Sequence, residues 1–146
     1  MQHLHSEIEI GAPAQRVWHV LTDFAAYSSW NPFIRAIRGD LSLGARLEVT
    51  IHPDGGKAMS FKPKLVALEL QKELRWKGRL LLPGVFDGEH YFQLNSTSAG
   101  SVRFVQGERF SGLLVPLVLR GSMLAGTLRG FAAMNQALKA RAEALQ

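Results

Sequence analysis

The chain has 146 residues, no cysteine, and 17 lysines and arginines against 12 aspartates and glutamates, which gives a net charge of +5. This length predicts one domain over residues 1–146, large enough to bury about 68–70% of the surface of its unfolded chain and to hold a cavity. The absence of cysteine excludes a disulfide framework and a thiolate metal site. No apolar run is long enough to span a membrane, so we expect a cytoplasmic protein without integral membrane association. The basic residues are scattered along the chain, which predicts no nucleic-acid partner.

The start of the chain predicts a strand followed by two short helices. Residues 5–10 alternate polar and apolar side chains, which is the period of a half-buried strand. Pro13 can then open a helix whose apolar side chains recur every three or four residues. These side chains are Val17, Trp18, Leu21 and Phe24. One further helical turn fits before Pro32, because proline disfavours the helical conformation in the residue before it.

Residues 33–110 are predicted to form strands throughout. Turn signals stand at Gly39-Asp40, Gly44, residues 53–56, Lys72-Glu73, Pro83-Gly84 and residues 95–101. Six strands fit between them, which makes seven in all. Alternation places on the inward faces Leu47, Val49, Ile51, Leu74, Trp76, Gly78, Leu80, His90, Phe92, Leu94, Val102, Phe104, Gln106, Glu108 and Phe110. The opposite faces are rich in lysine and arginine, as expected of a sheet with one solvated side.

The last part of the chain predicts one long helix from about residue 115 to near the C-terminus. Pro116 suits its first turn. One arc of the helical wheel carries Leu113, Leu117, Leu124, Phe131, Leu138 and Ala142. About 30 residues span roughly 45 Å, so the helix needs a broad sheet beneath it. The predicted class is α+β, in the helix-grip arrangement: a curved seven-stranded antiparallel sheet wrapped around the long C-terminal helix, with two short helices between the first two strands.

Several sequence segments carry a resemblance to a known superfamily. They are IEIGAP at residues 8–13, YSSWNPF at residues 27–33, PGVFDGEH at residues 83–90 and QGERFSG at residues 106–112. In these segments the chain resembles the START-like (SRPBCC) superfamily, in particular its polyketide cyclase/dehydrase-like branch. The resemblance covers essentially the whole chain and implies the helix-grip fold. Since that superfamily includes lipid carriers, hormone receptors and polyketide cyclases, it also implies a cavity between the sheet and the final helix.

His90 and Glu108 are the sharpest candidates for chemistry, because polar side chains on apolar inward faces need a reason to be there. A hairpin centred on Ser98 would place His90 opposite Gln106 and diagonal to Glu108, within reach of a cross-strand network. Either this network supports the structure or orients a ligand, or His90 and Glu108 form a general acid/base pair, or these faces do not point inward. Arg120 lies on the apolar arc and either answers the Glu108 charge or turns its guanidinium to water.

The predicted cavity wall combines aromatic side chains from the strands with adaptable ones from the helix. The ligand-binding candidates are Trp30, Phe33, Trp76, Phe86, His90, Phe92, Phe104, Gln106, Glu108, Phe110, Arg120, Met123, Leu124 and Thr127. His3 and His5 share a strand face, but no third ligand has a suitable spacing, so we expect no metal. No nucleotide-binding glycine motif opens a helix, and we expect no cofactor.

Three functions fit these observations. The leading hypothesis is a protein that binds a hydrophobic small molecule, a lipid, a polyketide-like compound or an aromatic compound, between the sheet and the helix. The first alternative is an enzyme of the polyketide cyclase or dehydratase type, in which His90 and Glu108 move protons. The second alternative is a stress-response or regulatory protein that acts through a protein partner. The sequence allows a monomer or a homodimer.

Overall fold

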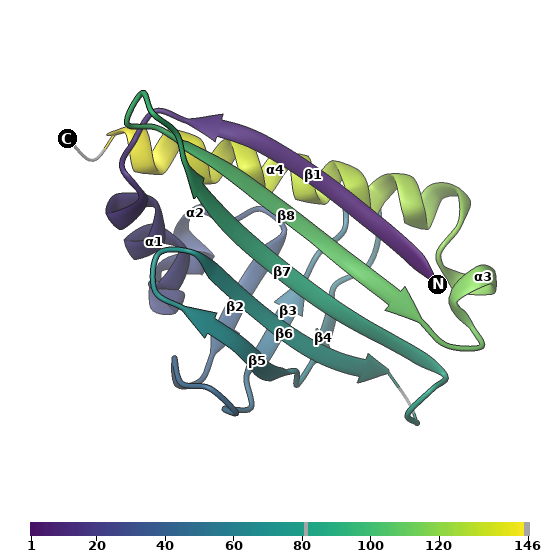
Figure 1. The fold of residues 1–146 in the computed structure, drawn as a ribbon. Helices are drawn as coiled ribbons and strands as arrows, with labels where there is room; N and C mark the ends of the chain where they lie inside the picture. The colour runs from purple at the N-terminus through teal and green to yellow at the C-terminus, as the bar shows by residue number, and fades with distance from the viewer. Residues whose placement is uncertain (81, 145–146) are drawn as a thin grey trace.

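The structure is a computed structural model in which residues 1–80 and 82–144 are described, residue 80 by its backbone alone. In chain order the elements are β1 (Gln2–Ile10), α1 (Ala14–Thr22), η1 (Phe24–Ala26), α2 (Tyr27–Trp30), β2 (Ile34–Arg38), β3 (Glu48–Ile51), β4 (Met59–Phe61), β5 (Lys64–Glu69), β6 (Glu73–Leu80), β7 (Phe86–Ser96), β8 (Val102–Ser111), α3 (Val115–Val118) and α4 (Gly121–Ala144). This is the predicted order of a strand, short helices, a run of strands and a final helix (Figure 1).

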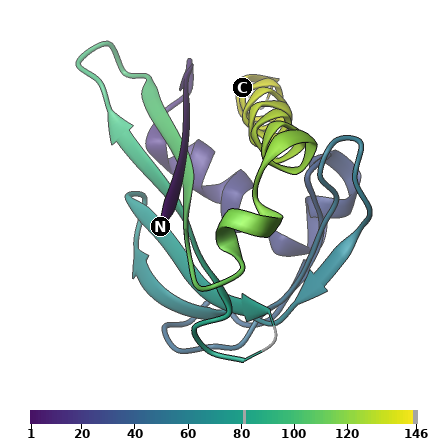
Figure 2. The same cartoon turned by 90° about the vertical axis from the view of Figure 1, so that its right-hand side faces the viewer.

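The strands form two antiparallel sheets that together make a curved wall. One sheet has the order β1-β8-β7-β6-β5 and the other has the order β2-β3-β4. They meet where the chain before β3 runs beside β5: the Leu47 N–H donates to the Pro63 carbonyl at 2.8 Å, and the Leu65 N–H donates to the Ala45 carbonyl at 2.9 Å. Figure 2 shows the sheets as two arms with α3 and α4 between them. The predicted α+β helix-grip class is therefore confirmed.

The described residues contain eight strands, one more than predicted. The segment between the turns at residues 53–56 and 72–73, predicted as one strand, is divided into β4 and β5 around Pro63. Proline has no N–H to donate to a sheet ladder. The chain accordingly changes partner at Pro63: β4 pairs with β3, whereas β5 pairs with β6.

The register of the β7–β8 hairpin also differs from the prediction. His90 pairs with Glu108 and Phe92 pairs with Gln106, so the predicted pairing of His90 with Gln106 is wrong. The loop of residues 97–101 closes by a hydrogen bond from the Thr97 N–H to the Ser101 carbonyl at 2.9 Å. This loop centres the hairpin one residue beyond Ser98. The inward faces are nevertheless as predicted, because the error moves the partner by two residues and the side-chain period of a strand is two.

The C-terminal helix begins later than predicted, and a separate helical turn, α3, precedes it. α3 ends at Val118, and Gly121 has a φ of +54°, a left-handed conformation that glycine adopts without steric cost. Leu113 and Leu117, predicted on the buried arc, are exposed, because the chain changes direction between them and α4.

The core fills one end of the fold and leaves the other end open for a site. Phe131, Met134 and Leu138 of α4 are buried against the sheet and α1. Gly130 lets the helix approach Phe33, because a Cβ at that position would overlap the Phe33 ring. The Phe33 and Phe131 rings then pack edge to face, with centroids 5.4 Å apart. The cavity lies toward the other end, beneath α3 and the first turns of α4.

Candidate functional site

A cavity of about 100 Å³ lies between the two arms of the sheet, beneath α3 and the first turns of α4. Since one water needs about 10–15 Å³ of such space, the cavity has room for several waters or a small organic molecule. The predicted residues that line it are Phe33, Trp76, Phe86, His90, Glu108, Phe110, Met123 and Thr127. They come from five parts of the chain that the fold brings together: the residue before β2, the strands β6, β7 and β8, and the helix α4.

The remaining predicted residues lie outside the lining. They are Trp30, Phe92, Phe104, Gln106, Arg120 and Leu124. Phe92 and Phe104 are fully buried and stack on each other in the core, with ring centroids 5.9 Å apart. Arg120 is exposed and, among the described residues, forms no ion pair with Glu108. The idea that Arg120 answers the Glu108 charge is wrong, because the break before Gly121 takes Arg120 out of the regular helix.

Other residues that line the cavity were not predicted as site residues. They are Ile34, Ile51, Met59, Phe61, Gly78, Arg79, Gly88, Val118 and Leu119. One sequence signal could have revealed part of this group. Gly78 and Gly88 pair with each other on neighbouring strands, so the wall has no side chain at two adjacent positions. Two paired glycines on inward faces indicate the close approach of neighbouring groups rather than a turn, and here Phe61 packs on Gly78 and Glu108 on Gly88.

The polar end of the cavity is built around His90. Its Nδ1 lies 2.8 Å from Glu108 Oε1, and its ring is almost fully buried. Trp76 stacks on the imidazole with centroids 5.4 Å apart and an interplanar angle of 16°, while Phe131 packs edge-on at 5.2 Å. These aromatic contacts hold the imidazole plane in one orientation and shield the His90–Glu108 hydrogen bond from water.

A chain of hydrogen bonds continues from His90 across the sheet to α4 and β1. His90 Nε2 lies 2.9 Å from Gln106 Oε1, and Gln106 Nε2 donates to Asn135 Oδ1 at 2.8 Å. Asn135 Nδ2 donates to Ser6 Oγ at 3.0 Å, and the Ser6 hydroxyl donates to the Gln106 carbonyl at 3.0 Å. Gln106 and Asn135 are both buried, so these hydrogen bonds satisfy polar groups that water does not reach.

The direction of this chain defines where His90 carries hydrogen. The Ser6 hydroxyl has one hydrogen, and it goes to a backbone carbonyl, so Ser6 Oγ must accept from Asn135. Asn135 then presents its oxygen to Gln106, and Gln106 presents its own oxygen to His90. His90 Nε2 must therefore be protonated. One further hydrogen lies between His90 Nδ1 and Glu108 Oε1, either on an imidazolium facing a carboxylate or on a carboxyl group facing a neutral imidazole.

Two polar atoms of the site have no hydrogen-bond partner among the described residues. Glu108 Oε2 is one, since only Oε1 contacts His90. Gly88 makes room for it, because a Cβ at Gly88 would overlap Glu108 Oε2. The second is the indole Nε1 of Trp76, which is buried and unpaired. Glu108 is partly exposed and lines the cavity, so its free oxygen can accept a hydrogen bond from a ligand there.

The described residues offer no group of three His, Cys, Asp or Glu side chains that could hold a metal ion. His3 instead hydrogen-bonds the Tyr91 hydroxyl at 2.7 Å. Burial lowers the pKa of His3, as do the positive charges of Arg109 and His5. Among the helices in residues 1–80 and 82–144, none has the length and apolarity needed to cross a bilayer.

A curved sheet that holds a long final helix, with a cavity between them, is the helix-grip fold that a START superfamily protein also has. Within that class, the chain belongs to the polyketide cyclase / dehydrase and lipid transport family, whose model matches residues 1–143. No curated protein has a significantly similar sequence.

Solved structures with low sequence identity share the fold. The Zhui aromatase/cyclase from Streptomyces sp. R1128 superposes with a TM-score of 0.78 at 18% identity, over 97% of this chain and 93% of that one. A hypothetical protein from Helicobacter pylori gives a TM-score of 0.79 at 16% identity, over 97% and 88%. A START superfamily protein from Mycobacterium smegmatis gives 0.73 at 18% identity, over 99% of both chains.

Proposed function

We propose that this chain binds a hydrophobic small molecule in the cavity between the sheet and α4. The observation that carries the proposal is the wall itself, in which aromatic and aliphatic side chains predominate and the buried polar groups gather at His90 and Glu108. Ligand sites commonly combine a mainly apolar wall with a few polar groups that orient the ligand. Membership of a family described by polyketide cyclization and lipid transport supports the same function.

The unpaired polar atoms narrow the chemistry of the ligand. Glu108 Oε2 offers an acceptor, when the carboxyl is ionised, to a hydroxyl, enol or amine on the ligand. The flat rings of Trp76, Phe86 and Phe110 favour a planar apolar body. A small aromatic or polyketide-like molecule with a hydroxyl group meets these demands.

Binding of the neutral fluorescent probe N-phenyl-1-naphthylamine tests this function. Met123 lines the cavity, so Met123→Trp should fill it and weaken probe binding by about tenfold or more. Leu128→Trp, on the outer side of the same helix, is the matched control and should bind the probe like the wild type. Equal affinities in all three proteins would place the probe elsewhere and contradict the proposal.

A second candidate function is an enzyme of the cyclase or dehydratase type. The observation that favours it is the 2.8 Å hydrogen bond between His90 and Glu108, two groups able to exchange a proton, on the wall of the cavity. The structural similarity to an aromatase/cyclase is in keeping with this function. In this case Glu108→Gln should abolish the conversion of a polyketide-like ketone while leaving the circular dichroism spectrum of the protein like that of the wild type. Retained turnover in Glu108→Gln would eliminate Glu108 as the acid/base.

A further inference from the structure

A group of exposed apolar side chains lies beside the cavity. α3 and the loop between β6 and β7 lie side by side, because the Leu113 N–H donates to the Gly84 carbonyl at 3.1 Å and the Leu114 N–H donates to the Val85 carbonyl at 2.9 Å. Between them they expose four large apolar side chains: Leu82 (72% exposed), Leu113 (82%), Leu117 (60%) and Val118 (39%). We call this group the mouth patch. Figure 2 shows α3 at the end of the molecule that faces the viewer.

The mouth patch is continuous with the cavity. Val118 belongs to both, and Leu119, the next residue, lines the cavity from the end of α3. A molecule that enters or leaves the cavity at this end therefore passes over the mouth patch. Exposed apolar clusters of this kind mark protein-binding or membrane-binding surfaces in soluble domains.

The charges that border the mouth patch are positive. Arg79 stands at its β6 side and Arg120 follows α3, both exposed and both without an ion pair among the described residues. In the sequence, residues 109–142 contain no aspartate or glutamate, and neither do residues 74–86. Asp87, at the start of β7, accepts a hydrogen bond from the Gly84 N–H at 3.1 Å. Leucines flanked by arginines are typical of segments that lie in the headgroup region of an anionic bilayer.

A second copy of the chain fits this surface less well. In a two-fold dimer the same patch meets itself, so Arg79 and Arg120 would face arginines of the same sign. No acidic residue of the patch could answer them, and like charges brought together at an interface oppose association. An anionic lipid surface, by contrast, supplies both the apolar layer for the leucines and the negative charge for the arginines.

We propose that the mouth patch docks the protein reversibly on an anionic lipid bilayer, with Leu113 and Leu117 inserted at the headgroup boundary and Arg120 at the phosphates. The proposal rests on the ligand-binding function above, since docking would bring the entrance of the cavity against the apolar phase of the bilayer. A hydrophobic ligand could then pass between bilayer and cavity without crossing water.

Flotation with lipid vesicles tests the proposal. The wild-type protein should float with vesicles of phosphatidylcholine and phosphatidylglycerol, but not with phosphatidylcholine alone, and high salt should weaken the binding. The double variant Leu113→Ser/Leu117→Ser should lose about tenfold or more of this affinity, and Arg120→Gln should lose several-fold. The matched control is Leu70→Ser, whose leucine is equally exposed (72%) in the β5–β6 turn at the other end of the sheet.

Binding of N-phenyl-1-naphthylamine without vesicles separates this proposal from the ligand-binding function. Leu113 and Leu117 do not line the cavity, so the double variant should keep its probe affinity and its circular dichroism spectrum while it loses vesicle binding. Absence of vesicle binding by the wild type would overturn the proposal, as would equal losses in the double variant and in Leu70→Ser. The double variant could instead lose binding only to an acidic protein and not to vesicles. The mouth patch would then be a protein-docking surface, and the lipid proposal would be wrong.

Discussion

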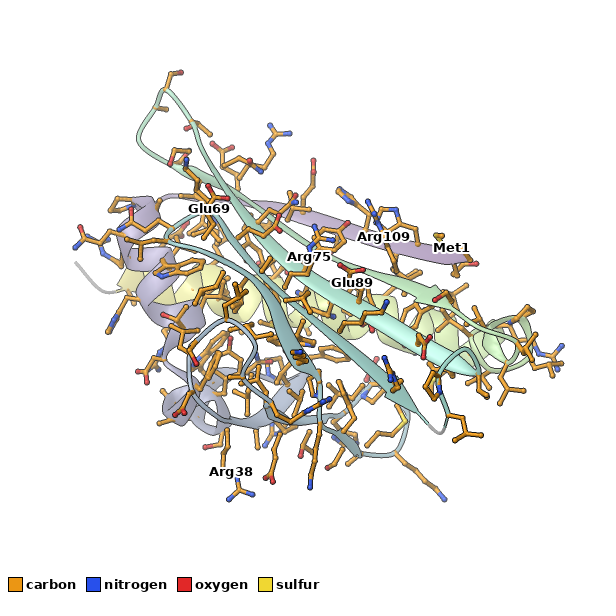
Figure 3. All side chains as sticks on the ribbon, turned by 60° about the horizontal axis from the view of Figure 1, so that its bottom comes forward. Met1, Arg38, Glu69, Arg75, Glu89 and Arg109 are labelled. Atoms are coloured by element: carbon orange, nitrogen blue, oxygen red, sulfur yellow. The ribbon has the colours of Figure 1, made fainter. Side chains whose placement is uncertain are left out.

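Each face of the strands β6, β7 and β8 carries a cluster of polar side chains. The two clusters differ in whether all of their polar atoms have hydrogen-bond or ion-pair partners. On the outer face, Arg75 contacts the carboxylates of Glu73 at 3.2 Å and Glu89 at 3.3 Å, and its guanidinium lies 4.9 Å from the centre of the Tyr91 ring. Gln93 donates to Glu73 at 2.8 Å. Figure 3 shows Arg75 and Glu89 together on neighbouring strands of this face. Here each charged group has a partner of opposite charge.

On the inner face, only some polar atoms in the cluster around His90 and Glu108 have hydrogen-bond partners. His90 uses both ring nitrogens, toward Glu108 and Gln106. Glu108 Oε2 and the Trp76 indole nitrogen remain without partners among the described residues. A cluster that is complete in itself contributes to stability, whereas one with unused groups on a cavity wall leaves them for a ligand. The position of the unmatched atoms, rather than the number of charges, distinguishes the candidate site from the surface.

The largest expected difference between the clusters is in stability. His90→Leu leaves the largely buried Glu108 carboxylate and the fully buried Gln106 oxygen without their partner, so it should lower the free energy of unfolding by about 3 kcal/mol. Arg75→Leu, on the outer face, should lower it by only about 1 kcal/mol, because solvent can reach the released carboxylates. Urea denaturation measures both values. Equal losses would show that the inner cluster is no more dependent on its partners than the outer one.

A smaller effect is expected when the space for Glu108 is removed. Gly88→Ala places a Cβ where Glu108 Oε2 lies, so the carboxylate must move, at a cost of about 1–3 kcal/mol in the free energy of unfolding. The displacement should also change the His90 side-chain resonances in the NMR spectrum. Gly56→Ala is the matched control, because its Cβ would make only ordinary contacts with Pro53. Unchanged His90 resonances in Gly88→Ala would contradict the placement of Glu108 against β7.

The fold could be predicted from the sequence because its elements have clear periods. The alternation that put His90 and Glu108 on one inward face survived an error in register, since a shift of two residues does not change the face. The divided strand at Pro63 and the break at Gly121 were harder to predict. Both depend on which neighbour the chain pairs with or leaves, and a helical wheel that assumes one continuous helix cannot show that Leu113 and Leu117 leave the buried arc.

The site could be predicted only where the strand pattern alone decides which side chains point inward. Trp76, Phe86 and Phe110 follow from alternation, and they line the cavity. Met59 and Phe61 do not, because their contribution depends on how the three-stranded sheet folds over the other one. Likewise, Asn135 joins the His90 chain only through the packing of α4 on β1 and β8. Such contacts between distant segments are not encoded in a local period.

The orientation of the imidazole gives a prediction that involves little change in stability. In protein labelled with ¹⁵N-histidine, the His90 Nε2 should carry hydrogen, because Gln106 presents only its oxygen. Asn135→Leu removes the group that orients the Gln106 amide, so the tautomer should then become mixed. The signals are assigned by comparison with His90→Gln. A neutral imidazole protonated only at Nδ1 in the wild type would reverse the inferred direction of the hydrogen bonds that run from His90 through Gln106 and Asn135.

The smallest expected effect concerns the outer cluster and its dependence on pH. Partial burial opposes the ionisation of Glu73, but hydrogen bonds from Gln93 and Arg75, together with the Arg75 charge, outweigh it and hold the pKa of Glu73 below its ordinary value. A depressed carboxyl pKa means that the unfolded chain takes up the proton first as the pH falls. The stabilising contribution of Glu73 is therefore fully present above the ordinary pKa of a glutamate and is lost as the pH falls through the lowered value.

Urea denaturation of Glu73→Gln across this range checks the sign. Near neutral pH the variant should be less stable than the wild type by about 1 kcal/mol or less, and the difference should shrink as the pH falls, because the wild-type carboxyl then becomes protonated as well. Glu69→Gln, in an exposed pair with Lys72 at 3.7 Å, is the control and should change stability by only a few tenths of a kcal/mol. If the stability difference between the wild type and Glu73→Gln grew as the pH fell, the outer cluster would not stabilise Glu73 as a carboxylate. The outer cluster would then resemble the inner one in leaving a charged group without an effective partner.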